Sequence, residues 1–109
     1  MDAQTKTATA AFRAKLAPLF DVQQAILFGS RARKTHRAES DADVAVVLRG
    51  KAGHFLDTKF AMDDLAYEVL LDTGIRIQPL PIWMDEWEHP EHYSNPRLLI
   101  NIKAQGVVL

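Results

Sequence analysis

Ile26 to Leu48 read ILFGSRARKTHRAESDADVAVVL, and this stretch decides the fold that the sequence predicts. The apolar run from Ala25 to Phe28 is typical of a buried strand. Gly29-Ser30 follows it and is expected to form a tight turn that opens into a short basic helix. A second apolar run, Val44 to Leu48, indicates another buried strand shortly afterwards. Two strands joined through a Gly-Ser turn are therefore the centre of the predicted fold.

The turn and the short helix have the features of a phosphate-binding edge. Gly29 has no Cβ, so the backbone can turn sharply and a ligand can approach it closely. Ser30 adds a hydroxyl group and an N–H at the start of a helix, where free N–H groups favour anions. Four positive charges follow within seven residues, at Arg31, Arg33, Lys34 and Arg37.

Asp41 and Asp43 lead into the second strand, and their spacing predicts a metal site. Side chains at i and i+2 of a strand lie on the same face, so the two carboxylates are expected to be close together. Their mutual repulsion would be relieved by a divalent cation, and oxygen ligands suit Mg²⁺ bound together with a nucleoside triphosphate. The alternative is a solvated Asp-x-Asp pair, but the preceding Gly-Ser favours the metal site.

Gly29-Ser30-Arg31-Ala32-Arg33 followed by Ser40-Asp41-Ala42-Asp43-Val44 resembles the minimal nucleotidyltransferases (MNT domains) of the DNA polymerase β-like superfamily. Their motif is Gly-Ser, about ten residues, then Asp-x-Asp, and Lys34 departs from it where the family often has glycine. The resemblance extends over nearly the whole chain. It implies an α/β (α+β) nucleotidyltransferase fold, in which helices flank a mixed β-sheet.

The resemblance also implies roles for the motif residues. Gly29 and Ser30 would hold the β- and γ-phosphates of ATP, the nucleotide substrate. Arg31 and Arg33 would neutralise phosphate charge. Asp41 and Asp43 would be the catalytic carboxylates and would bind Mg²⁺.

Composition is consistent with one domain over residues 1–109. Thirteen basic and fourteen acidic residues give a net charge of 13 − 14 = −1, so direct nucleic-acid binding is not expected. There are no cysteines, which excludes disulfides and Cys-ligated metals. No apolar run is long enough for a membrane span, no signal peptide is recognisable, and a cytoplasmic location is expected.

The predicted order of elements is α-β-α-β-α-β-α. Helices are expected at Met1–Leu16, Ser30–Lys34, Leu56–Leu71 and Asn95–Gln105, and strands at Gln24–Phe28, Ala42–Leu48 and Ile75–Trp83. Ser94 is the predicted N-cap of the last helix, and Leu19 is assigned to the apolar stripe of the first. Pro79 and Pro81 place the third strand at an edge of the sheet or past its end.

Catalytic members of the superfamily usually have a third carboxylate on the strand that follows the long helix. Here the polar positions of that strand are Arg76 and Gln78, and neither can act as a base or bind Mg²⁺ well. If this face borders the two aspartates, Arg76 could pair with one of them. Glu68, Asp72 and Asp85 are candidate substitutes that no spacing favours.

The resemblance implies a partner as well as a reaction. Free-standing MNT domains commonly pair with a helical HEPN-domain RNase toxin, and several neutralise it by transferring AMP from ATP to a toxin tyrosine. Such an antitoxin is the predicted function. A catalytically inactive module that blocks the toxin by contact alone is the alternative. Aminoglycoside-modifying enzymes share the motif but carry a further substrate domain.

Two further clusters lie near the C-terminus. Trp83, Trp87 and Tyr93 lie within eleven residues and are candidate partner-binding residues, since Trp and Tyr are favoured in interfaces. His89 and His92 lie in an acidic segment that favours a solvated loop or partner contact over a zinc site, because Pro90 interrupts the helical spacing of the ligands.

Overall fold

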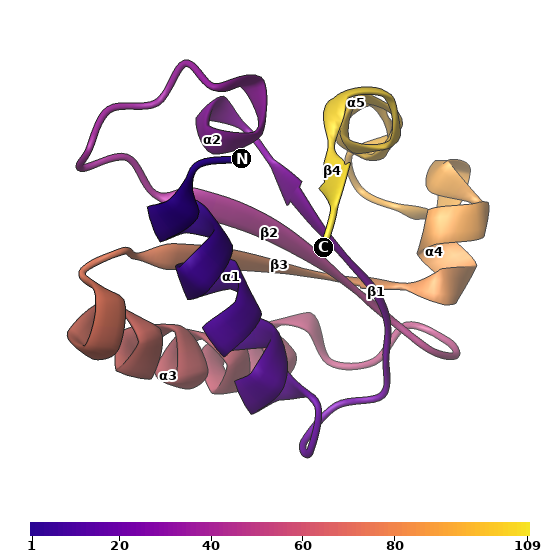
Figure 1. Cartoon of the computed structure of the whole chain (residues 1–109). Helices are drawn as coiled ribbons and strands as arrows, with labels where there is room; N and C mark the ends of the chain where they lie inside the picture. The colour runs from indigo at the N-terminus through magenta and orange to yellow at the C-terminus, as the bar shows by residue number, and fades with distance from the viewer.

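A computed structural model describes all residues of the chain, 1–109 (Figure 1). The helices are α1 (Ala3–Leu16), α2 (Ser30–Arg33), α3 (Phe55–Thr73), α4 (Met84–Glu88) and α5 (Pro96–Gln105), with a 3-10 turn, η1, at Pro90–His92. The strands are β1 (Val22–Phe28), β2 (Ala42–Leu48), β3 (Ile77–Trp83) and β4 (Val107–Val108). The predicted alternation of helices and strands is confirmed, with α4, η1 and β4 added to it.

The four strands form one mixed sheet in the order β3-β2-β1-β4. β1 pairs antiparallel with β2 and with β4, whereas β2 and β3 are parallel. Parallel neighbours need a long crossover connection, and α3 supplies it. This topology brings the start of β2 beside the end of β1 and the start of β3, so all three meet at one end of the sheet.

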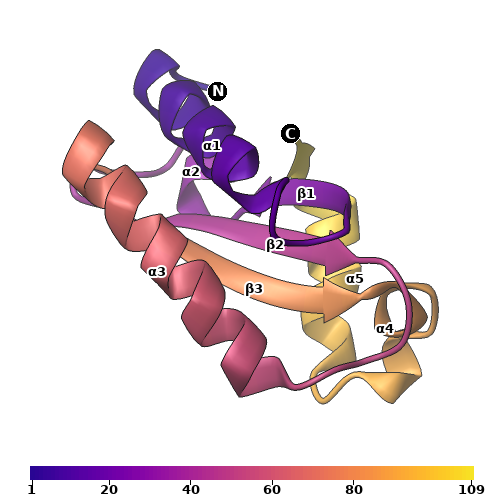
Figure 2. The ribbon, with the colours of Figure 1, turned by 90° about the horizontal axis from the view of Figure 1, so that it is seen from below.

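Helices cover both faces of the sheet (Figure 2). α1 and α3 pack on one face, where buried side chains such as Phe12, Leu27, Val46 and Met62 form the larger core cluster. α5 covers the other face over Ile26 and further buried residues of the smaller cluster. The predicted helix-flanked sheet is therefore confirmed, and alternate residues of β2 face opposite cores.

β3 is an edge strand, as its prolines predicted. The N–H of Ala42 on β2 donates to the carbonyl oxygen of Arg76, so the alternate residues Pro79 and Pro81 face the open edge, where their missing N–H groups cost no hydrogen bond to β2. On α3, Lys59 Nζ donates to the carbonyl oxygen of Pro79 at 3.1 Å and to Asp63 Oδ1 at 3.0 Å. A charged side chain from the covering helix therefore lies directly over the open edge.

Three local predictions need correction. Leu19 is 65% exposed, because α1 ends at Leu16 and the following turn takes Leu19 off the helical stripe. Asn95, not Ser94, is the N-cap of α5, and its Oδ1 accepts a hydrogen bond from the N–H of Leu98. β3 begins at Ile77, two residues after the predicted start at Ile75.

The two longest helices, α1 and α3, each bury one stripe of side chains against the sheet. None of the helices combines the length and hydropathy that crossing a bilayer requires.

Candidate active site

The turn between β1 and α2 brings the backbone of Gly29 against the side chain of Asp43. Gly29 has φ 74° and ψ −156°, a conformation that is essentially restricted to glycine. A Cβ at this position would overlap Oδ2 of Asp43. Glycine is therefore required by the backbone angle, and a Cβ would in addition displace the carboxylate of Asp43.

The two aspartates lie at the start of β2 and face the same side of the sheet. In the sheet, Asp43 is the register partner of Phe28 on β1 and of Gln78 on β3. Burial raises the pKa of the Asp43 carboxyl, and the neighbouring charge of Asp41 raises it further, while Arg33 acts in the opposite direction. The mutual repulsion of the two carboxylates, expected from their spacing, is thus present in the folded protein.

Gln78 fixes one of these carboxylates. Its Nε2 donates to Oδ2 of Asp41 at 3.3 Å, linking the start of β3 to the residue just before β2. The sequence predicted that the polar face of this strand could border the aspartates, and for Gln78 the contact is present. Arg76 makes no ion pair with either aspartate, although it is one of the residues that line the pocket between α3 and β3.

Of the basic residues that follow the turn, Arg33 is exposed on α2 and lowers the pKa of Asp43. Lys34 ends α2 with φ 61° and is the only non-glycine residue with positive φ. That backbone conformation favours glycine, which gives a physical reason for the residue that the family often has there.

Arg31 needs a correction, because its guanidinium faces the protein interior. Only 2% of its surface is exposed. It donates to Thr5 Oγ1 at 2.9 Å, to the carbonyl oxygen of Ser40 at 2.9 Å and to that of Ala38 at 3.1 Å. Arg31 thus ties α1 to the loop that leads into Asp41, and its hydrogen bonds leave it poorly placed to neutralise phosphate. Nothing in the sequence separated it from Arg33.

No third acidic side chain joins the two aspartates. The fold contains no group of three or more His, Cys, Asp or Glu residues placed to hold a metal ion. Glu68 lies 3.6 Å from Lys15, and Asp85 lies 3.8 Å from His92, both in other parts of the fold. The two carboxylates of Asp41 and Asp43 still suit a hard divalent cation, since they would leave its other coordination positions to water and phosphate oxygens.

The three aromatic residues proposed as a partner-binding patch are separated by the sheet. Trp83 is 7% exposed and belongs to the core beneath α1 and α3. Trp87 and Tyr93 are half-buried against the opposite core, where Lys103 Nζ lies 4.6 Å from the Trp87 ring centroid. They do not form one exposed surface. The His89 and His92 rings stack at 5.2 Å, and their acidic neighbours are exposed.

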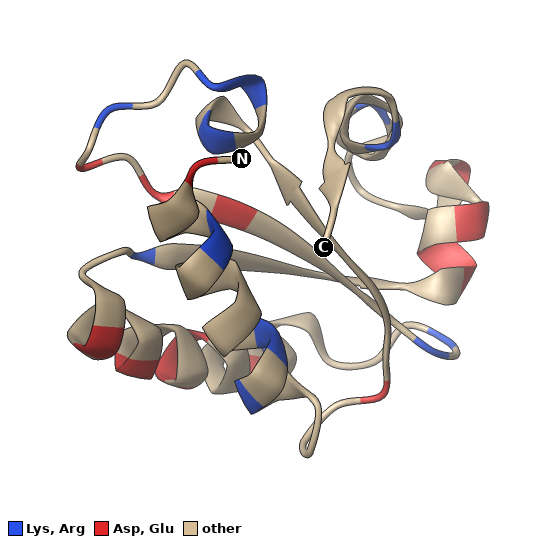
Figure 3. Cartoon of the chain, viewed as in Figure 1, with Lys and Arg blue, Asp and Glu red and all other residues tan.

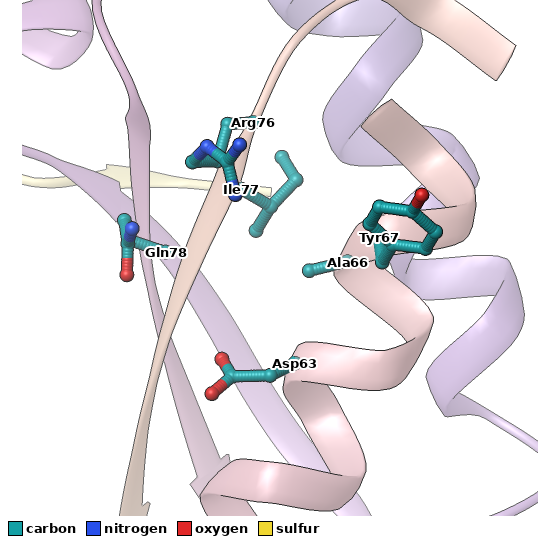
Figure 4. A pocket seen from close by; sticks show the side chains of 6 residues that line it. All are labelled: Asp63, Ala66, Tyr67, Arg76, Ile77 and Gln78. Carbon is teal, nitrogen blue, oxygen red and sulfur yellow. The ribbon is translucent and has the colours of Figure 1, made fainter. Parts of the chain in front are cut away.

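Two pockets border the aspartate site. One, of about 250 Å³, lies between α3 and β3 and is lined by Asp63, Ala66, Tyr67, Arg76, Ile77 and Gln78 (Figure 4). The other, of about 150 Å³, lies between the Gly29 turn and α5 and is lined by Phe28, Gly29, Arg33, Leu98, Asn101, Ile102 and Gln105. Sequence reasoning missed the contribution of α5, because helical spacing does not reveal which distant loop a helix faces.

Comparison with known proteins agrees with this architecture. The family model for polymerase beta nucleotidyltransferases matches residues 13–80, which include the Gly-Ser turn and both aspartates. A crystal structure of a candidate nucleotidyltransferase from Sulfolobus solfataricus is 16% identical, with a TM-score of 0.54 over 99% of this chain and 86% of that chain. The structure of the CdnC:HORMA-deltaN complex of E. coli MS115-1 contains a chain 20% identical, with a TM-score of 0.49 over 93% of this chain and 42% of that chain. No curated protein gives a significant match.

Proposed function

This chain belongs to the polymerase beta nucleotidyltransferase family, and from that premise we propose that it is an MNT-type antitoxin that transfers AMP from ATP to a tyrosine of a HEPN-domain RNase toxin. One observation carries the proposal: Asp41 and Asp43 lie together at the start of β2, with the Asp43 carboxylate against the Gly29 backbone. Two carboxylates and a turn that allows close approach to the backbone are thereby joined at one place, which supports a site for a metal-bound nucleotide.

Each residue of the site has a role in this proposal. Asp41 and Asp43 hold Mg²⁺, which when bound stabilises negative charge on the phosphates. Gly29 and Ser30 accommodate the β- and γ-phosphates at the start of α2, and Arg33 adds an exposed positive charge beside them. The pocket between the turn and α5 offers Asn101 and Gln105 as polar side chains for the nucleoside.

The reaction is an in-line displacement at phosphorus. The tyrosine oxygen forms a bond to the α-phosphorus, the bond from that phosphorus to the bridging oxygen breaks, and pyrophosphate leaves. The tyrosine proton passes to solvent, because the chain places no third carboxylate beside the aspartates. Gln78 contributes by orienting Asp41 through its amide. General-base help is typically worth about 10²–10⁴-fold in rate, so we expect slow transfer.

The second candidate function is a contact inhibitor of the same toxin without catalysis. It is favoured by the amide of Gln78, which lies at a polar position of the strand where catalytic relatives usually carry an acid. The two candidates differ in one measurable outcome, which is whether the partner gains AMP.

The test uses a HEPN-domain protein encoded by the neighbouring gene, incubated with this chain, ATP and Mg²⁺, and analysed by intact-mass spectrometry. We expect the mass of one AMP on the partner, and its loss with Asp41→Asn or Asp43→Asn. Glu39→Gln is the matched control, since Glu39 is an exposed carboxylate in the adjacent loop. A partner that is neutralised without added mass would select the contact inhibitor.

A further inference from the structure

The outer side of α3 carries a stripe of apolar side chains that the fold leaves uncovered. Leu56, Phe60, Tyr67 and Leu71 are each 58–68% exposed. At about 100° per residue they lie within roughly 60° of arc, and they extend over about 22 Å of helix. Met62, Ala66 and Val69 point the other way, into the core. We call these four residues the α3 stripe; exposed apolar side chains gathered on one side of a helix are a feature of interaction sites.

The charges beside the α3 stripe restrict what can cover it. α3 contains five acidic residues and one lysine, which gives it a net charge of 1 − 5 = −4. By the same helical spacing, four of the acids form a row along one side of the stripe, at Asp57, Asp64, Glu68 and Asp72. Glu68 Oε1 lies 3.6 Å from Lys15 Nζ of α1, whereas the other three carboxylates make no ion pair within the chain. Figure 3 shows acidic positions along this helix. A second copy that packed its own stripe antiparallel against this one would bring two acidic rows together, which is unfavourable.

The α3 stripe also leads to the candidate active site. Tyr67 belongs to the stripe and lines the same pocket as Arg76 and Gln78 (Figure 4). Gln78 in turn donates to Asp41. A chain segment lying on α3 would therefore lie beside a pocket lined by Gln78, the residue that also contacts a proposed metal-binding carboxylate.

We infer that the α3 stripe docks an amphipathic helix of a partner protein, with apolar residues at three- and four-residue spacing flanked by lysine or arginine. The apolar residues would bury the stripe, and the basic flank would lie along the acidic row. That this helix belongs to the protein that accepts AMP rests on the proposed function, whereas the docking itself does not.

Fluorescence anisotropy with three synthetic helical peptides tests the inference on the full chain. The first has an apolar stripe flanked by lysine, the second has the same stripe flanked by glutamate, and the third scrambles the first. We expect the lysine-flanked peptide to bind at least about tenfold more tightly than the other two, and its affinity to fall as salt is added. Equal binding of all three peptides would overturn the inference.

Matched variants locate the binding surface. Phe60→Ser and Leu71→Ser should each weaken binding of the lysine-flanked peptide, with a loss of roughly tenfold or more at one of them, as for a central interface residue. Ile100→Ser is the control, because Ile100 is 56% exposed on α5, across the sheet. Unchanged binding by both α3 variants, at matched thermal stability, would refute the assignment.

Two more measurements separate the alternatives. Sedimentation equilibrium of the chain alone should show a monomer, and a dimer that Phe60→Ser dissociates would replace the partner helix with a second copy. Asp41→Asn should bind the lysine-flanked peptide normally. If AMP transfer is not observed, the proposed function is wrong but the docking inference is unaffected. If the peptides do not bind, the docking inference is wrong but the proposed transfer is unaffected.

Discussion

Replacing Arg31 by methionine should destabilise the protein strongly and affect nucleotide binding only through the loop before Asp41. A hydrogen bond to a charged group contributes about 1.5–3 kcal/mol, and Arg31 makes three of them. Water can replace the guanidinium at the loop carbonyls of Ala38 and Ser40, so the loss of those two hydrogen bonds lowers the free energy of unfolding by less. Thr5 is fully buried, and an unsatisfied buried group costs about 1–3 kcal/mol. We expect a total loss of about 2–4 kcal/mol.

Thermal unfolding followed by circular dichroism measures this loss. For a domain of about this size, 1 kcal/mol shifts the Tm by roughly 4–8 °C, so the Tm of Arg31→Met should fall by at least about 8 °C. Arg33→Met is the matched control: Arg33 is exposed on the same short helix, and its stability should change by no more than about 0.5 kcal/mol. Isothermal titration with Mg²⁺–ATP should show the reverse order, with the larger loss of affinity in Arg33→Met.

The opposite pattern would refute this reasoning. If Arg31→Met kept the parent Tm and lost nucleotide affinity, Arg31 would be a phosphate ligand, as the sequence first indicated. The buried hydrogen bonds would then have no energetic importance, and the loop before Asp41 would be held by other contacts.

Three further outcomes are expected. Burial and Asp41 raise the pKa of Asp43 above its ordinary 3.8, so the parent loses stability as pH rises from about the ordinary value through the raised one. Urea unfolding in chelator should show the free energy of unfolding of Asp43→Asn increasing relative to the parent over that range, and a constant difference would contradict the shift. Gly29→Ala should cost about 1–3 kcal/mol in the same assay, since its φ is essentially restricted to glycine, and a neutral result would show that the turn can relax. Gln78→Glu should tighten Mg²⁺ binding in calorimetry while lowering metal-free stability, and unchanged metal affinity would place this side chain outside the site.

The parts of the fold that the sequence predicted well are those set by local chemistry. The second strand, Ala42–Leu48, has the predicted bounds because its apolar run is continuous and turn-forming residues flank it. The long helix, predicted at Leu56–Leu71, is observed at Phe55–Thr73 and ends at Gly74, whose φ of 78° suits glycine. The prolines of β3 predicted its edge position because a missing N–H affects any strand in the same way.

The predictions that were wrong concern features that depend on tertiary packing. Arg31 and Arg33 are the same residue type two positions apart, and only the packing of α1 decides which is buried. Trp83 was separated from Trp87 because a strand residue and a helix residue came to lie on opposite faces of the sheet. β4 has two residues, too few for an alternating pattern. Such long-range contacts cannot be predicted from the residues that are neighbours in the sequence.

The edge strand β3 has a consequence for how this protein can assemble. Sheets often recruit a strand from another chain by continuing the hydrogen-bond ladder, and the same process leads to fibrils. Here Pro79 and Pro81 offer no donors, and Lys59 already occupies the Pro79 carbonyl. At the opposite edge, β4 is only two residues long. An incoming strand would find few groups to pair with on either side, so the chain is protected from edge-to-edge polymerisation even at the high local concentrations of a newly synthesised protein.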